Sequence, residues 1–315
     1  MPLHHLIAAT LQATAVAGAV QPWSIADVRR AAEQSRPAPT PDQPRVTMHD
    51  MGIPGPGGDM PSRAYLPTGG GPHPILMFFH GGGFVTLGAD SLDYLCTRLC
   101  AWTDYMVISV GYRLAPEHPF PAAPDDCLAA TRWAFSQAAQ LGGDPSQIAV
   151  AGTSAGACLA AVVSQRARDE GGPRLCGQLL FYPVTDYPSS PTASYMTFGN
   201  AYGLTRAQMI WFWEQYLPDK TWAKHPHASP LRIDRALGLP ATYVVVAECD
   251  PLHDEGVAYA EKLSRAGVDT TLQDVESVNH GFLRFVGALP QADNAIRAAS
   301  NWLMRRPVAR EPLQS

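Results

Sequence analysis

A chain of 315 residues is long enough for one large α/β domain with an additional lobe, or for two small domains. Hydrophobic residues make up 46% of the chain and charged residues 16%, which supports a substantial core and excludes an intrinsically disordered protein. The formal net charge is −5, and lysine and arginine form only short pairs, so the sequence has no electrostatic footprint for binding nucleic acid.

The first forty residues have apolar positions at helical spacing in two short stretches, which predicts two helices ahead of the main domain. Ser24, with Asp27 three residues later, is typical of a helix start, and the prolines in 37–44 end any helix. Residues 1–20 lack the basic start of a secretory signal, and no run reaches the roughly 18 apolar residues needed to span a bilayer. We therefore expect a cytoplasmic protein without a membrane span.

From residue 45 the pattern changes to strands. Two strand-like runs, 45–49 and 63–66, flank the glycine- and proline-rich segment 52–58, which predicts a hairpin. Farther along, apolar runs of strand length alternate with helical patterns, and these runs cover residues 75–79, 106–110, 148–151, 178–182, 243–247 and 270–275. Such alternation is typical of a mostly parallel sheet with helices on both faces, and so predicts an α/β fold.

The segment from about 186 to 235 interrupts this alternation. It is rich in aromatic residues, including Tyr195, Phe198, Tyr202, Trp211, Phe212, Trp213 and Tyr216. An inserted helix pair packed as ordinary core explains this density as well as the wall of an apolar pocket does.

The most informative stretch is GTSAG at 152–156, which lies between a short apolar run and an alanine-rich helical segment. A serine at a sharp strand-to-helix turn is typical of a nucleophilic hydrolase, because the turn pushes the hydroxyl of Ser154 outward. Glycine is needed two positions to either side, where a side chain would collide with the tight backbone. Alone, the pattern fits a glycine-flanked helix start equally well.

A serine hydroxyl is a poor nucleophile at neutral pH, so Ser154 requires a base and a carboxylate that orients the base. In hydrolases with this type of sheet, the chain order is serine, acid, histidine. Asp250 follows a predicted strand and precedes Pro251, which places its carboxylate at the carboxyl edge of the sheet, and His280 lies in the loop after the last predicted strand. We select Asp250 as the acid and His280 as the base. The weaker candidates for the acid are Glu248, Asp254 and Glu255.

Acyl transfer also requires hydrogen-bond donors for the oxyanion of the tetrahedral intermediate, and glycine lets the main chain approach a substrate. The run HGGGF at 80–84 follows a predicted strand and supplies such a loop. The amide of Ala155, next to the serine, would complete the oxyanion site. We expect His80 to hold this loop by hydrogen bonds rather than to act as a base.

Together these motifs resemble the hormone-sensitive-lipase-like family of α/β-hydrolase esterases. The resemblance covers roughly residues 45–300 and rests on HGGGF at 80–84, YRLAPEHPFPAA at 112–123, GTSAG at 152–156, DPLHDEG at 250–256 and NHGF at 279–282. Threonine before the serine looks like one branch of that family. The resemblance implies Ser154 as nucleophile, Asp250 as acid and His280 as base. It implies three main-chain oxyanion donors, the amides of Gly82, Gly83 and Ala155.

The same resemblance implies an α/β-hydrolase catalytic domain at 45–315. Residues 1–44 and an insertion at about 186–235 would form a helical cap over it. The sequence thus predicts a carboxylesterase that hydrolyses short- to medium-chain acyl esters through an acyl-serine intermediate. Amidase or deacetylase activity on a small metabolite shares the same triad and stays open. A non-catalytic small-ligand receptor on this fold is a further alternative, although such receptors lose the base.

No cofactor is required for this chemistry. No metal is expected either, since the six cysteines lack zinc spacing and His225 and His227 have no third ligand nearby in the sequence. The expected partner is a small-molecule ester, not nucleic acid, and a homodimer is possible. We further expect the cysteines to be core thiols, His253 to face solvent in a loop, and Arg113 to pair with Glu117.

Overall fold

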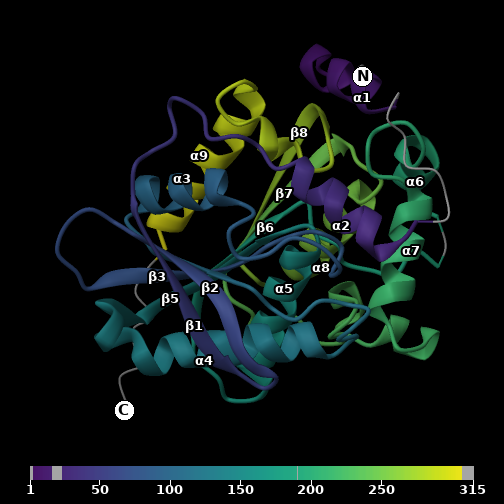
Figure 1. Cartoon of the computed structure of the whole chain (residues 1–315). Helices are drawn as coiled ribbons and strands as arrows, with labels where there is room; N and C mark the ends of the chain where they lie inside the picture. Colours follow the sequence, from purple (N-terminus) through teal and green to yellow (C-terminus); the bar gives the residue numbers. More distant parts are fainter. Residues whose placement is uncertain (1–2, 16–22, 190, 307–315) are drawn as a thin grey trace.

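The computed structural model describes residues 3–15, 23–189 and 191–306, and a central sheet dominates it (Figure 1). Within these residues the sheet has eight strands in the order β1 (Thr47–Gly55), β2 (Gly58–Leu66), β4 (Met106–Val110), β3 (His73–Phe79), β5 (Gly143–Thr153), β6 (Leu175–Phe181), β7 (Thr242–Cys249) and β8 (Thr270–Asn279). The β1–β2 and β2–β4 pairs are antiparallel, and the remaining pairs are parallel. The predicted α/β fold is confirmed.

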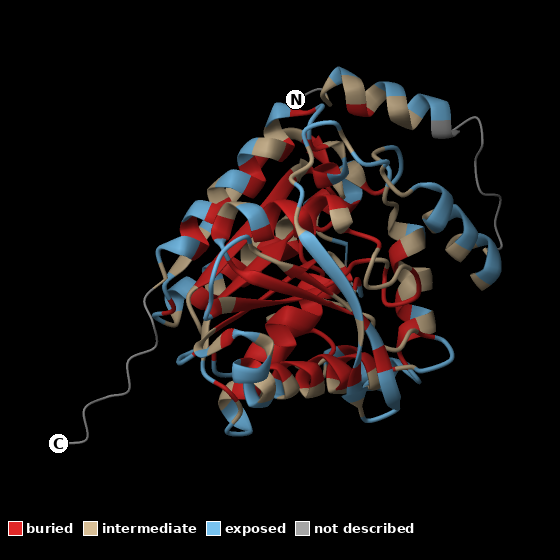
Figure 2. Ribbon diagram, turned by 60° about the vertical axis from the view of Figure 1, so that its left-hand side comes forward, coloured by how far each residue is buried: buried red, intermediate tan, exposed pale blue. Residues whose placement is uncertain are grey.

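The parallel strands are apolar along their whole length because both faces of the sheet are covered. In β3, Ile75, Met77 and Phe79 pack into one hydrophobic cluster. Leu76 and Phe78, which point the opposite way, pack into a second cluster. Figure 2 shows this buried centre in red, with exposed surface confined to the outer elements. A strand buried on both faces needs no polar alternation, which explains the unbroken apolar runs.

Helices cover the two faces of the sheet. On one face lie α4 (Ala122–Leu141), α5 (Ala155–Asp169) and α8 (His253–Arg265), and on the other lie α3 (Asp93–Thr103) and α9 (Pro290–Met304). The remaining helices are α1 (His5–Ala15), α2 (Ile25–Gln34), α6 (Ala193–Phe198) and α7 (Arg206–Tyr216), with short 3₁₀ turns η1 (Lys220–Lys224), η2 (Pro230–Arg232) and η3 (Phe282–Phe285).

The hairpin at the edge of the sheet is longer than the sequence predicts. Strands β1 and β2 pair from Thr47 with Leu66 to Gly55 with Gly58, so only two residues form the turn. Gly52 and Pro54, which we expected in the loop, lie within β1. Glycine and proline are tolerated there because β1 is an edge strand.

Helix α2 forms at the predicted position. The Ser24 side chain caps it by accepting a hydrogen bond from the amide of Asp27. None of its residues is buried, and polar contacts attach it to the main domain. Arg29 donates to Glu117 at 2.6 and 2.8 Å and to two main-chain carbonyls. Residues 16–22, which also belong to the expected cap segment 1–44, lie outside the described residues.

The expected pairing of Arg113 with Glu117 is wrong. Arg113 instead forms a bidentate pair with Asp126 of α4, at N···O distances of 2.7 to 3.1 Å, and the Asp126 side chain is fully buried. Glu117 faces α2 and pairs with Arg29. Proximity in the sequence favoured Glu117, but the start of α4 brings Asp126 against the Arg113 backbone and side chain.

Three findings concern membranes, metals and thiols. In the part of the chain that the structure describes, no helix has the length and apolar character needed to cross a membrane. Among the same residues, histidine, cysteine and acidic side chains form no group of three or more that could hold a metal ion. All six cysteines are free thiols, five of them buried and Cys176 half-buried, as expected for core thiols.

Candidate active site

Ser154 lies at the turn between β5 and α5 with φ 52° and ψ −118°, an unusual conformation for a residue that is not glycine. A Cβ atom at Gly152 would lie 2.2 Å from the carbonyl oxygen of Gly156, and one at Gly156 would lie 1.9 Å from that of Phe79. The clashing atoms are backbone and cannot rotate away. The two glycines of GTSAG are therefore required because β3, β5 and α5 approach one another closely around the serine.

His280 joins Ser154 to Asp250. Its Nε2 lies 2.9 Å from Ser154 Oγ, and its Nδ1 lies 2.6 Å from Asp250 Oδ2. A carboxylate only accepts hydrogen bonds, so Nδ1 carries the proton and Nε2 is left to accept from the serine hydroxyl. Asp250 is 1% exposed, and its other oxygen, Oδ1, accepts from the amide of Leu252 at 2.9 Å. Three loops at the carboxyl edge of the sheet thus bring the predicted residues into one hydrogen-bonded row.

The rival carboxylates have other partners. Glu248 accepts a hydrogen bond from the amide of Ser277, and Asp254 from the amide of Ser194. Glu255 is buried on α8, accepts from the amides of Thr185 and Asp186, and has its pKa raised chiefly by burial. Asp250 is the carboxylate that contacts His280.

The glycine loop after β3 runs beside the serine. Gly82 and Gly83 have φ of 100° and 62°, a region that side chains rarely adopt. A Cβ at Gly83 would lie 2.4 Å from the ring of Phe212, so the loop and α7 also pack closely. Among the described residues, we find no intramolecular hydrogen bond from the three amides expected to bind an oxyanion, those of Gly82, Gly83 and Ala155.

His80 holds this loop, as the sequence predicts. Its Nδ1 donates to the carbonyl of Gly81 at 2.8 Å, and its ring stacks on Tyr112 with centroids 4.2 Å apart. Burial lowers the pKa of His80 to about 4, so the ring is neutral near neutral pH. The Tyr112 hydroxyl fixes the same turn by donating to the His80 carbonyl at 2.7 Å.

Ser154 and His280 open onto a cavity of about 230 Å³. Its wall combines the glycine loop, the end of α2, the start of η3 and the insertion. The insertion contributes Leu204, Met209 and Phe212, and residues near the end of α2 contribute Ala32, Ser35, Arg36 and Pro37. Trp23, just before α2, contacts Trp211 of α7 with ring centroids 6.1 Å apart, so the two segments are neighbours (Figure 1).

The aromatic residues of the insertion divide between the two roles left open by the sequence. Phe212 lines the cavity. Trp213 and Tyr216, on the same helix, are fully buried, and Tyr216 stacks on Phe84 with centroids 3.8 Å apart. Helical periodicity turns neighbouring residues of α7 toward different surroundings, so both interpretations are correct for part of the set.

The insertion also contacts the loops that carry Asp250 and His280. Ser194 at the start of α6 donates from Oγ to the carbonyl of Pro251, next to Asp250, at 2.7 Å. Asn279, next to His280, donates from its side chain to the carbonyl of Tyr202 at 2.8 Å. The insertion is therefore hydrogen-bonded to the loop of Asp250 and to the loop of His280.

The cavity residues that the sequence analysis did not single out include Arg36, Tyr182 and Arg284. Tyr182 follows β6 and packs edge-on against the His280 ring, with centroids 4.9 Å apart. Its place at the end of a parallel strand was a usable signal, as was the position of Arg284 just after the NHGF motif. Arg36 carried no such signal.

The expectation about His253 is wrong. His253 is not a solvent-facing loop residue: it begins α8, is half-buried, and lies 3.0 Å from Asp274 and 3.2 Å from Asp254. These carboxylates, Asp274 first, raise the pKa of His253 to about 9. Helix α8 begins at His253, three residues after Asp250. This start of the helix directs the His253 ring toward Asp274 of β8.

Comparisons with known proteins agree on one family. A family model described as the alpha/beta hydrolase fold matches residues 76–284. The chain is 44% identical over 260 residues to the carboxylic ester hydrolase LipN of Mycobacterium tuberculosis, across 81% of this chain and 68% of that protein. It is 39% identical over 246 residues to the ethyl acetate hydrolase of Pseudomonas putida, across 76% of each chain. The structure of a hyperthermophilic esterase from Pyrobaculum calidifontis superposes with a TM-score of 0.92 at 36% identity, covering 96% of this chain and 98% of that one.

Proposed function

The chain belongs to the hormone-sensitive-lipase-like family of α/β-hydrolase esterases and is a carboxylic ester hydrolase, and we propose that it works through an acyl-serine intermediate on short- to medium-chain esters. The observation that carries the mechanism is the hydrogen-bonded row from Ser154 through His280 to Asp250. In this row each group has the partner that its chemical role requires.

In the first step, His280 Nε2 takes the proton of Ser154 as Oγ attacks the ester carbonyl carbon. The carbonyl π electrons move onto oxygen and give the tetrahedral intermediate. When this intermediate collapses, the alkoxide leaves with the proton from His280, and the acyl group stays on Ser154. Water then attacks the acyl carbon while His280 accepts its proton, and a second tetrahedral intermediate forms. When this intermediate collapses, His280 returns the proton to Ser154 Oγ and the acid is released. Asp250 keeps the imidazole oriented and stabilises its protonated form.

The amides of Gly82, Gly83 and Ala155 are proposed to bind the oxyanion. The positive φ values of the two glycines turn this loop toward the serine, and Ala155 opens α5, where a helix N-terminus favours negative charge. Donors fixed by the fold need no reorganisation when the charge develops, which makes such sites effective in a partly enclosed cavity.

The cavity supports the proposal of small substrates. Its volume of about 230 Å³ and a wall that includes Leu87, Leu92, Leu204, Met209 and Phe212 suit a short apolar acyl or alkyl group. The relative named ethyl acetate hydrolase is consistent with this size class. We propose that α2 and the insertion form the cap of the cavity and set the accepted chain length.

Replacement of Ser154 by alanine tests the nucleophile. We expect S154A to lose more than about 10³-fold in kcat with p-nitrophenyl butyrate, and to lose stoichiometric labelling by an organophosphate. Ser164→Ala is the matched control, because it removes a buried hydroxyl from α5, the helix that follows Ser154, where Oγ donates to the carbonyl of Ala160. Retention of more than about a thousandth of the activity in S154A would point to another nucleophile.

A further inference from the structure

The wall of the cavity at Ser154 contains basic side chains. Two arginines, Arg36 and Arg284, contribute to it. Among the described residues, no aspartate or glutamate does. An arginine attracts an anionic substrate only if nearby carboxylates do not already neutralise its charge. The partners of each guanidinium therefore show which of the two arginines could do so.

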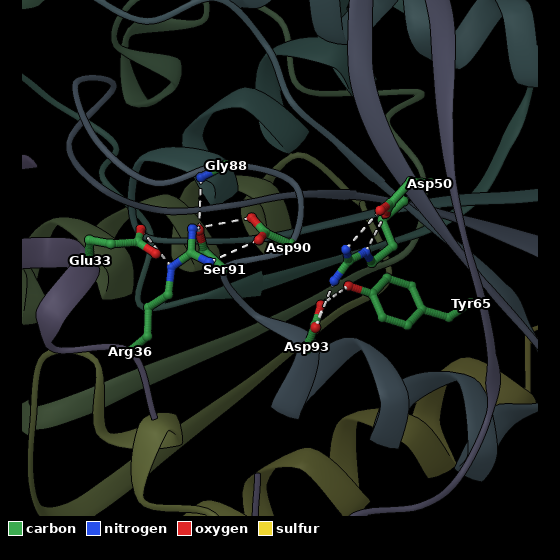
Figure 3. Close-up of polar contacts among 9 residues, drawn as sticks. Glu33, Arg36, Asp50, Tyr65, Gly88, Asp90, Ser91 and Asp93 are labelled. Carbon is green, nitrogen blue, oxygen red and sulfur yellow. Dashed lines mark hydrogen bonds and ion pairs between the residues drawn. The ribbon is translucent and has the colours of Figure 1, made fainter. Parts of the chain in front are cut away.

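The charge of Arg36 is fully compensated, as Figure 3 shows. Its two terminal nitrogens bind Asp90 in a bidentate pair at 2.9 and 3.1 Å, and its Nε lies 2.8 Å from Glu33. The same guanidinium also donates to Ser91 Oγ at 2.8 Å. Two carboxylates thus face one arginine, and this side of the cavity does not attract an anion.

Arg284 is in a different situation. Its guanidinium donates to the main-chain carbonyl of Ser35 at 2.9 Å and lies 5.6 Å from the ring centroid of Phe285. Within the described residues it forms no ion pair. Both contacts are with neutral groups, so the full positive charge remains at the edge of the cavity, where its other N–H groups can donate to a ligand.

The position of Arg284 ties this charge to the reaction. The residue belongs to η3, directly after the base, and its amide donates to the carbonyl of Gly281 at 3.1 Å. Burial raises the pKa of Tyr94 and Tyr182, and the nearby Arg284 charge partly opposes that effect. Both tyrosines line the same cavity as Arg284.

We infer that Arg284 is a specificity-determining residue that favours esters carrying a carboxylate group. This inference rests on the proposed function, since it concerns which esters reach Ser154. A carboxylate that approaches Arg284 gains a charge-assisted hydrogen bond without displacing an existing ion pair. The net charge of −5 would otherwise disfavour anionic substrates.

Two pairs of isosteric esters separate charge from shape. In the first pair, monoethyl glutarate carries the carboxylate on the acyl portion, and ethyl 5-methylhexanoate replaces it with an isopropyl group. In the second pair, acetoxyacetate carries the carboxylate on the alcohol portion, and isobutyl acetate is its neutral counterpart. The measured quantity is the ratio of kcat/KM, anionic to neutral, near neutral pH.

We expect Arg284→Gln to lower this ratio about five- to tenfold for at least one pair. This decrease lies between the effect expected for an exposed ion pair and that expected for a buried charge-assisted hydrogen bond. Arg284→Lys keeps the charge and should retain most of the ratio. Added salt should reduce the ratio in the wild type more than in R284Q. The matched control is Arg297→Gln, which removes an equal charge from an exposed arginine that stacks on Trp102, outside the cavity.

An unchanged ratio in R284Q for both pairs would overturn the inference, as would an equal decrease in R297Q, which would indicate a general effect of net charge. Failure of the proposed function has a different signature: the neutral esters would show no hydrolysis that depends on Ser154. In that case the inference falls with it.

Discussion

Replacing Asp250 with asparagine tests the assignment of the acid at a single atom. In the native site, Asp250 Oδ1 accepts from the amide of Leu252 at 2.9 Å, and Oδ2 faces His280 Nδ1 at 2.6 Å. An asparagine must keep its carbonyl oxygen toward the Leu252 amide, because its NH₂ group would meet an N–H there. Its NH₂ group then occupies the Oδ2 position and faces His280.

An NH₂ group opposite Nδ1 selects the wrong tautomer of His280. Nδ1 becomes the acceptor and Nε2 carries the proton, so the ring no longer accepts a proton from Ser154. Loss of the correct tautomer in a serine triad lowers kcat about 10³- to 10⁴-fold, which corresponds to about 4–5.5 kcal/mol in the activation barrier. We expect Asp250→Asn to fall in this range with little change in folding, since the two side chains have the same shape.

The assay is kcat with p-nitrophenyl butyrate, normalised by active-site titration, with circular dichroism to monitor the fold. Asp254→Asn is the control, because an amide oxygen can still accept from the Ser194 amide that Asp254 binds at 2.9 Å. We expect D254N to retain kcat close to that of the wild type. If D250N keeps more than about a tenth of kcat, or if D254N loses as much as D250N, the tautomer argument is refuted.

Two further predictions concern stability. In the folded protein, chiefly the hydrogen bond to Asp274 raises the pKa of His253 to about 9, above its unfolded value of about 6.5. The resulting stabilisation of the fold is therefore complete below about pH 6.5 and is lost as pH rises through about 9. His253→Gln should therefore lower Tm at pH 6 but not at pH 10, and an equal decrease at both would contradict this. Asp126→Ala leaves the Arg113 guanidinium without its buried partner and should cost about 3–5 kcal/mol in urea unfolding. Glu117→Ala removes a side chain that is 53% exposed and should cost less than about 1 kcal/mol, and similar losses in both variants would refute the argument from burial.

Local patterns located the elements that depend mainly on neighbouring residues. The predicted strand 106–110 matches β4 at both ends, because the sequence of a strand buried on both faces is an unbroken apolar run. Near the edge of the sheet this signal weakens. Gly52 and Pro54 favoured a loop, yet β1 includes both, because an edge strand can accommodate residues that would interrupt an interior strand.

The sequence by itself determined where the serine, aspartate, histidine and glycine loop that we propose for catalysis stand along the chain. Each lies next to the end of a strand. GTSAG is recognisable in the sequence because the backbone around Ser154 has no room for a Cβ atom at either flanking glycine. These are constraints that act within a few residues or on one close packing contact, so one sequence is enough to reveal them.

Only the tertiary structure decided which partners distant side chains have. It placed Asp126 rather than Glu117 against Arg113, turned His253 toward Asp274, and left Arg284 without a carboxylate at the cavity. Charge pairing depends on distances of a few ångströms between elements far apart in the chain, and residue type alone does not encode those distances. The fold therefore sets the electrostatics of the cavity around the row of Ser154, His280 and Asp250, whose members were already predictable from the sequence.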